Sequence, residues 1–198
     1  MALKNSTLET SIEQSKRLLV GRRDAENLQL LESTIQRFPD DPEVRLLYAT
    51  ALVPFRPNEA PWQAATAIQL DPDSPSRLTR AASLMFYLGE LEAARSYTAR
   101  ASRLAPEDFE LEADLTNIAG VIAAACGDDA LAERALTEAT EAEPQREVFA
   151  RDLATFLADR GRLAEALDAI DRALTRVGDT TQLSRLRADL VSKDSRRD

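Results

Sequence analysis

The sequence of 198 residues contains no histidine and one cysteine, Cys126. Because histidine is the commonest general base and metal ligand, its absence removes every Ser-His or Cys-His nucleophile pair. A single cysteine allows no intramolecular disulfide, and we expect Cys126 to pack as a small residue between helices. Glycine-rich phosphate loops are also missing. We therefore predict no catalytic, cofactor or metal site, and we expect the chain not to be an enzyme.

Positive charge is in short supply, with 25 lysines and arginines against 34 aspartates and glutamates and a net charge of −9. Nucleic-acid binding normally needs a cationic surface that displaces counterions from phosphate, so nucleic acids and anionic membranes are not expected partners. No stretch approaches the roughly 20 apolar residues that cross a bilayer. The first seven residues lack the apolar core of a signal peptide, which predicts a cytoplasmic location.

Aromatic residues make up only 5% of the chain, whereas alanine and leucine are abundant. Alanine lets two helix backbones approach, and leucine fills the space between them. β-Branched residues do not form long runs, so no strand is expected. This composition predicts an all-α protein.

Several residue types recur together along the chain. Prolines that follow helical stretches are separated by 33, 34 and 38 residues, and three series of mostly small residues share the intervals 34, 38 and 34. Because independent registers carry the same irregular interval at the same place, the pattern indicates an internal repeat. The four series are Pro39, Pro72, Pro106 and Pro144; Tyr48, Ala82, Gly120 and Ala154; Ala60, Ala94, Ala132 and Ala166; and Ala67, Ala101, Ala139 and Ala173.

Each repeat is predicted to contain two helices. Glycines such as Gly89 accept the left-handed conformation that ends a helix, and a proline closes the second helix. Asp41 and Ser74 each precede a proline, which is typical of an N-cap followed by the first helical residue. The sequence Ser6-Thr7-Leu8-Glu9 has the pattern of a capping box that opens the first helix.

These residues resemble the tetratricopeptide repeat (TPR) family, most closely over residues 75–178. The resemblance implies one right-handed superhelical solenoid domain over residues 1–198. It contains about five helix-turn-helix repeats, a capping helix at 180–192 and a frayed tail at 193–198. Pro54-Phe55-Arg56-Pro57 replaces the turn glycine of the second repeat, and the first repeat matches only in outline. The five repeats are 8–39, 41–72, 75–106, 107–144 and 147–178.

The interval of 38 residues adds roughly one helical turn to the fourth repeat. We expect this turn at the start of its first helix, which begins near Pro106 and continues to about Ala125. Gly120 then lies inside a helix, where glycine costs up to about 1 kcal/mol relative to alanine. Close packing against a neighbouring helix is the expected compensation.

The resemblance also implies a ligand-binding face, because TPR proteins bind peptides or proteins mainly through the first helix of each repeat, on the concave side. Asn117 offers a donor and an acceptor to a peptide backbone, Arg45 and Arg151 suit carboxylates, and Leu52 with Phe86 would form an apolar floor. Lys and Asn residues that hold a carboxy-terminal peptide in some TPR proteins are not matched. The predicted face comprises Arg45, Leu52, Thr79, Ser83, Phe86, Asn117, Val121, Arg151 and Thr155.

A second candidate surface is the turn that carries Phe55 and Trp62. Exposed aromatic residues mark contact sites when they form a patch, although Trp62 fits the core equally well. The leading hypothesis is an adaptor or scaffold that binds a protein or peptide. The alternatives are a protein that self-associates as a homo-oligomer and a non-catalytic subunit of an enzyme complex.

Overall fold

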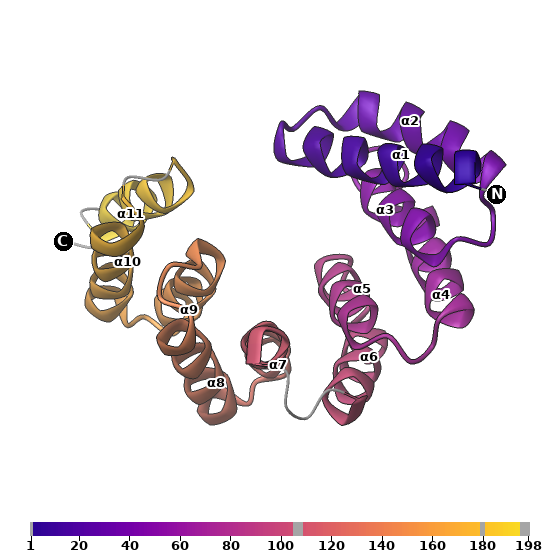
Figure 1. Ribbon diagram of the computed structural model, residues 1–198. Coiled ribbons are helices and arrows are strands. Elements are labelled where there is room, and N and C mark those ends of the chain that lie inside the picture. Colours follow the sequence, from indigo (N-terminus) through magenta and orange to yellow (C-terminus); the bar gives the residue numbers. More distant parts are fainter. Residues whose placement is uncertain (1, 105–108, 179–180, 195–198) are drawn as a thin grey trace. The chain divides into compact units, whose positions relative to one another are not determined.

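The computed structural model describes residues 2–104, 109–178 and 181–194, and all regular structure in these ranges is helical (Figure 1). The prediction of an all-α protein is therefore confirmed. The helices are α1 (Ala2–Val20), α2 (Asp24–Arg37), α3 (Pro42–Leu52), the 3₁₀ helix η1 (Pro57–Glu59), α4 (Ala60–Leu70), α5 (Pro75–Tyr87), α6 (Leu91–Leu104), α7 (Phe109–Cys126), α8 (Asp129–Ala142), α9 (Glu147–Asp159), α10 (Leu163–Val177) and α11 (Thr181–Asp194).

Consecutive helices pack as pairs, and each pair corresponds to one predicted repeat: α1 with α2, α3 with α4, α5 with α6, α7 with α8, and α9 with α10. The chain divides into two compact units, Met1–Leu104 and Ala105–Asp198. We refer to them as unit 1 and unit 2. A single superhelical solenoid over the whole chain stays a prediction.

Unit 1 is built around α3, which contacts α1 and α2 on one side and α5 on the other, besides its partner α4. Leu31, Val44 and Leu52 are completely buried in its core, and Tyr48 is 7% exposed. Asp41 and Ser74 accept hydrogen bonds from the backbone N–H groups of Val44 and Arg77, at 2.9 Å and 3.4 Å. Both predicted N-caps are thus confirmed.

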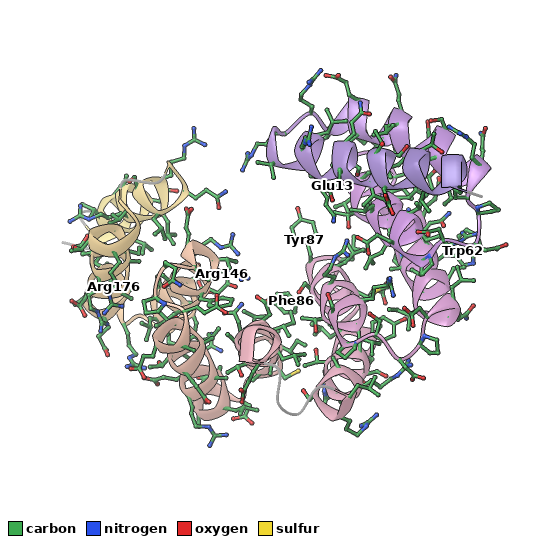
Figure 2. All side chains as sticks on the ribbon, in the orientation of Figure 1. Glu13, Trp62, Phe86, Tyr87, Arg146 and Arg176 are labelled. Atoms are coloured by element: carbon green, nitrogen blue, oxygen red, sulfur yellow. The ribbon has the colours of Figure 1, made fainter. Side chains whose placement is uncertain are left out.

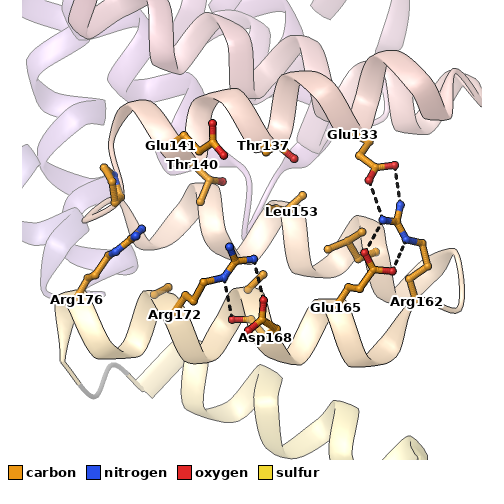
Figure 3. Close-up of a pocket in the computed structure, with 14 residues that line it drawn as sticks. Glu133, Thr137, Thr140, Glu141, Leu153, Arg162, Glu165, Asp168, Arg172 and Arg176 are labelled. Carbon is orange, nitrogen blue, oxygen red and sulfur yellow. Dashed lines mark hydrogen bonds and ion pairs between the residues drawn. The ribbon is translucent and has the colours of Figure 1, made fainter.

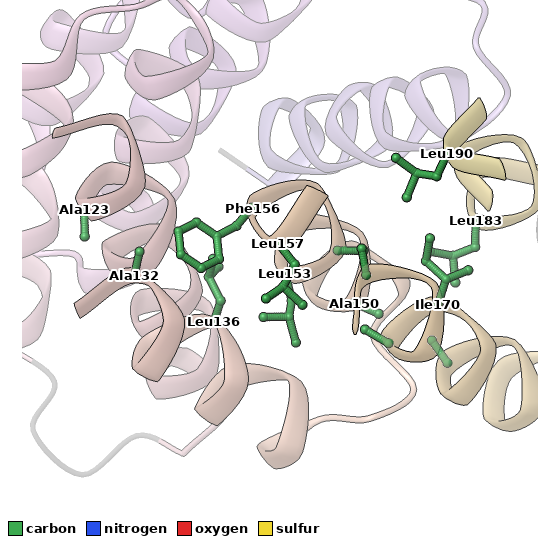
Figure 4. Close-up of a cluster of buried hydrophobic side chains, with 14 residues drawn as sticks. Ala123, Ala132, Leu136, Ala150, Leu153, Phe156, Leu157, Ile170, Leu183 and Leu190 are labelled. Carbon is green, nitrogen blue, oxygen red and sulfur yellow. The ribbon is translucent and has the colours of Figure 1, made fainter. Parts of the chain in front are cut away.

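The core of unit 2 runs from α7 to α11 (Figure 4). In α11, Leu183 and Leu190 are buried, whereas Val191 is 40% exposed. A helix that covers the end of α9 and α10 with one apolar face is what a terminal cap requires. The helix continues to Asp194, beyond the predicted end at 192, and residues 195–198 of the predicted tail lie outside the described ranges.

Gly120 confirms the expectation of close helix packing in the fourth repeat. Helix α7 has 18 residues, compared with 13 in α5 and α9. A Cβ atom placed on Gly120 would lie 2.8 Å from Cγ of Leu136 in α8. The missing side chain therefore lets α7 approach α8. The predicted start of this helix near Pro106 falls outside the described residues.

Left-handed backbone conformations end the first helix of four repeats. Gly89, Gly127 and Gly161 have φ of 80°, 80° and 77°. In the first repeat the corresponding residue is Arg22, with φ of 52°. Arg22 makes the same short hydrogen bond back into the helix, from its N–H to the carbonyl of Leu19 at 3.1 Å. The sequence offered no signal for this residue because the neighbouring glycine, at position 21, is one place too early.

Two sequence-based expectations are wrong. Helix α1 begins at Ala2, so Ser6-Thr7-Leu8-Glu9 lies inside the helix instead of capping its start. Cys126 is exposed at the end of α7 and is not packed between helices. The chain ends α7 there to enter the turn at Gly127, and this places the last side chain at the surface.

Candidate functional site

In unit 1, Arg45 is held by contacts within the unit. Its Nε donates to the carbonyl oxygen of Pro39 at 2.6 Å, and its Nη1 donates to Oε1 of Gln63 at 2.8 Å. The guanidinium also lies over the ring of Trp62, 5.9 Å from its centre. Since these contacts use Nε, Nη1 and the face of the guanidinium, Arg45 is a structural link between α3 and α4.

Two other predicted contact residues of unit 1 lie in the interior. Leu52 is completely buried, and Thr79 is 4% exposed and donates its hydroxyl to the carbonyl of Pro75 at 2.9 Å. Leu52 therefore cannot form part of an exposed apolar floor. The reason is that Leu52 belongs to the cluster of buried residues that α3 shares with α2 and α4, against which apolar side chains of α1 also pack.

The remaining predicted residues of α5 reach the surface. Ser83 is exposed and donates to the carbonyl oxygen of Thr79 at 3.1 Å, and Phe86 is partly buried. Tyr87, which the sequence analysis did not select, is 75% exposed and projects from the end of α5 (Figure 2). Sequence analysis missed Tyr87 because the TPR pattern assigns ligand contact to the preceding residue, Phe86.

The aromatic residues of the second candidate surface are both exposed, Phe55 to 48% and Trp62 to 63%. The alternative that Trp62 belongs to the core is therefore wrong. Its ring contacts the Arg45 guanidinium, which holds the indole at the surface of unit 1. Cation–π contacts of this kind hold an aromatic ring in place without burying it.

In unit 2, the predicted residues Asn117 and Arg151 are joined through Asp152. Nδ2 of Asn117 donates to Oδ2 of Asp152 at 2.9 Å. The guanidinium of Arg151 donates to Oδ1 of the same carboxylate from Nε at 3.0 Å and from Nη2 at 2.8 Å. Asp152 was missed by the sequence analysis, although an acidic residue directly after a candidate arginine is a usable signal.

The Asn117 side chain retains one unused acceptor. The residue is 7% exposed, and its Oδ1 has no hydrogen-bond partner. A buried carbonyl oxygen without a donor costs about 1–3 kcal/mol, and this atom is shielded from solvent, so the cost is borne inside unit 2. Asp152 fixes which end of the amide is the donor, and this leaves the oxygen as the free end.

Val121 and Thr155 extend the same face along α7 and α9. Val121 is partly buried against the core of unit 2, and Thr155 is exposed and donates to the carbonyl of Arg151 at 2.8 Å. At the other end, Arg146 pairs with Asp114 and lies over the ring of Phe149 at 4.8 Å. We call the residues Asn117, Val121, Arg151, Asp152 and Thr155 the α7–α9 face.

The surface of unit 2 shows no arrangement that suits a metal ion, since no group of three histidine, cysteine or carboxylate side chains converges among the described residues. Within the same residues, no helix has both the length and the apolar character needed to span a bilayer. The chemistry of the α7–α9 face is thus hydrogen bonding and ion pairing.

Solved structures with a similar fold are TPR proteins. The chain matches TTC0263, a thermophilic TPR protein of Thermus thermophilus, with a TM-score of 0.79 and 23% identity over 93% of this chain and 98% of that one. It matches PilW, a type IV pilus biogenesis factor, with a TM-score of 0.72 and 17% identity over 94% and 86% of the two chains. YrrB, described as a TPR protein with an unusual peptide-binding site, gives 0.53, with 17% identity over 90% of each chain.

No family model matches the sequence, and no curated protein matches it. The structural matches establish that the chain has the TPR fold, as the repeat pattern predicted.

Proposed function

We propose that this chain is a protein–protein interaction module, and that the α7–α9 face binds a peptide or protein partner. The observation that carries the proposal is the position of Arg151, whose side chain is 41% exposed and is held by Asp152 on the same helix as the exposed Thr155. A partner backbone can accept from the remaining N–H groups of Arg151 and donate to the hydroxyl oxygen of Thr155.

The charges on this face favour a partner segment that offers backbone hydrogen-bonding groups, and not charged side chains. Arg151 is neutralised by Asp152, so it offers its remaining N–H groups as hydrogen-bond donors to carbonyl oxygens. Val121 supplies a small apolar contact next to them. An extended peptide offers alternating N–H and C=O groups and fits this pair of functions. The proposal involves no catalytic step.

The test is affinity capture from the native lysate with the intact protein and with the double variant Asn117→Ala, Arg151→Ala. Arg45 is left unchanged because it links α3 to α4. The control is Arg95→Ala, an exposed position on α6 outside the α7–α9 face. We expect a partner that the intact protein and the control retain and the double variant loses, with all three equally folded by circular dichroism. A partner held equally by the double variant would show that the α7–α9 face is not the binding surface.

Self-association through unit 1 is a second candidate, supported by the exposure of Trp62 at 63%. Large aromatic residues at the surface are typical anchors of protein interfaces. The Trp62→Ser variant would remove a concentration-dependent increase in mass, measured by sedimentation, if this ring is the anchor. An unchanged mass would exclude Trp62 as the anchor of self-association.

The free thiol of Cys126 at the surface fits a reducing compartment such as the cytoplasm.

A further inference from the structure

A groove of about 240 Å³ lies between α8 and α10, on the second helices of the last two repeats (Figure 3). Leu153 and Leu157 of α9 and Ala169 and Ala173 of α10 line its apolar floor. Threonines and carboxylates of α8 form one rim, and arginines and carboxylates of α10 form the other. The groove is separate from the α7–α9 face, with which it shares no residue.

One end of the groove is closed by ion pairs. Arg162 donates to both oxygens of Glu133, at 2.6 Å and 2.8 Å, and to both oxygens of Glu165, at 2.8 Å and 2.6 Å. These hydrogen bonds lower the pKa of both carboxyls. The three side chains satisfy one another, so this end has little to offer a ligand.

The other end carries two arginines that remain accessible. Arg176 is exposed and makes no hydrogen bond or ion pair in the described part of the chain. Arg172 pairs with Asp168 at 3.0 Å, but these side chains are 63% and 64% exposed. Pairs this exposed contribute little and exchange partners readily. Glu141 stands on the opposite, α8 rim, so an acidic ligand group is directed to the α10 side (Figure 3).

The helices that line the groove, α8, α9 and α10, have equivalents in unit 1. These are α4, α5 and α6, which lie two repeats earlier in the chain. There Tyr97 stands at the position of Ala169, and burial raises the pKa of its hydroxyl. Arg100 stands at the position of Arg172, and its Nη2 donates across to the carbonyl of Pro72 at 2.7 Å. Unit 1 thus carries an aromatic residue and an arginine that bonds within the unit at these positions, whereas unit 2 has an alanine and two exposed arginines, of which only Arg172 is paired among the described residues.

We propose that the groove between α8 and α10 binds a partner peptide in which an aromatic residue adjoins an acidic residue. The ring occupies the apolar floor beside Ala169, the residue whose equivalent in the repeat of unit 1 is Tyr97. The carboxylate accepts hydrogen bonds from Arg176 and Arg172, which match a planar carboxylate through their forked donors. Recognition therefore combines a buried ring with a charge-assisted pair, as at many peptide-binding hot spots.

The test is selection of a phage-displayed library of random peptides on the full chain, followed by Kd measurement for an enriched synthetic peptide by fluorescence anisotropy. We expect enrichment of Phe, Tyr or Trp next to Asp or Glu. Arg176→Glu should weaken binding by about tenfold or more, the effect of losing one charge-assisted pair. Ala169→Tyr, which installs the residue of unit 1, should abolish binding because the new ring occupies the floor.

The matched control is Asn117→Ala, which changes the α7–α9 face and should leave the Kd of this peptide unchanged. Two results would overturn the proposal: no enrichment of the aromatic-acidic pair, or an enriched peptide whose Kd is unaffected by Arg176→Glu. Peptides that lose binding only with Asn117→Ala would support the α7–α9 face and refute the groove, so the two proposals fail separately. Arg176 is exposed, and its variant remains informative even where Ala169→Tyr impairs folding.

Discussion

Two helical pairs differ in the residues at which their helices meet. They are the first pair, α1 with α2, and the fourth pair, α7 with α8, and the difference lies at two equivalent positions of the repeat. In the fourth pair these positions hold Gly120 and Ala132, both buried. In the first pair they hold Ser15 and Asn27, each completely buried. The hydroxyl of Ser15 and both polar atoms of the Asn27 amide have no hydrogen-bond partner.

This difference shows that the fold tolerates polar residues where its helices cross, but at a cost in free energy. Buried amide groups without partners destabilise a protein by about 1–3 kcal/mol. The close approach of α7 to α8 avoids that cost, but it leaves no space for a side chain at Gly120. We therefore expect that a substitution can stabilise the first repeat, whereas a larger residue at Gly120 should destabilise the fourth.

The largest effect should come from Gly120→Val in the fourth pair. A valine side chain would overlap Leu136 and force α7 away from α8, which should lower the free energy of unfolding by about 2–3 kcal/mol. Urea denaturation measures this change. Ala125→Val, at an exposed position of the same helix, should cost only about 0.5 kcal/mol, and an equal loss in both variants would contradict the packing argument.

In the first pair, Asn27→Leu should have the opposite sign. The leucine has a similar shape and needs no hydrogen bonds, so the free energy of unfolding of unit 1 should rise by about 1–2 kcal/mol. Amide hydrogen exchange in α1 and α2 reports it locally. Gln29→Leu, an exposed position of α2, serves as the control and should change little. Faster exchange in Asn27→Leu would mean that the amide is satisfied by water.

The turns of the two pairs give a smaller, reciprocal test. Arg22 adopts a positive φ that costs a side-chain-bearing residue about 1 kcal/mol, so Arg22→Gly should stabilise unit 1 by somewhat less than this. Gly127→Ala should destabilise unit 2 by about 1 kcal/mol through the backbone alone, because no atom lies within 4 Å of the added Cβ. Thermal unfolding of both variants should shift in opposite directions. Shifts of the same sign would refute the equivalence of the two turns.

Acid should produce the mildest change, in unit 2. Hydrogen bonds from Arg162 lower the pKa of Glu133 and Glu165 below the ordinary value of 4.5. A carboxyl whose pKa is lower in the folded state stabilises that state at pH values above its ordinary pKa. This stabilisation is lost as the pH falls through the pKa of the folded state. Protection factors of the amides in α8 and α10, which correct for the intrinsic pH dependence of exchange, should therefore fall below about pH 4.5. Arg162→Gln should remove this part of the pH dependence, and an unchanged profile would contradict it.

Much of the fold could be predicted from sequence because its determinants are local. The caps at Asp41 and Ser74, the turn glycines and the small residue at Gly120 each act within one helix pair, and their spacing repeats. Arg22 was missed because its positive φ is imposed by the helices on either side, not by its own preference. Cys126 was misplaced because a position in the repeat does not fix whether the following turn exposes it.

The candidate site was predictable only in part. Asn117 and Arg151 are brought together by Asp152, as their shared register position suggested, but Arg45 at the same position turns to Gln63 and Pro39 instead. Leu52 is buried because it packs in a cluster with residues of α2 and α4. The same register position thus has different surroundings in different repeats, and spacing alone does not reveal them.

The sequence by itself determined the helical class, the repeat interval, the N-caps at Asp41 and Ser74 and the absence of histidine chemistry, because periodicity, capping and composition are properties of the chain. Tertiary structure alone decided which arginines are free, which small residue meets a neighbouring helix, and where a groove remains open. Those outcomes depend on side chains of different helices meeting in space. An alanine at position 169 and a tyrosine at position 97 fit the same repeat pattern, yet the alanine lines an open groove and the tyrosine is partly buried.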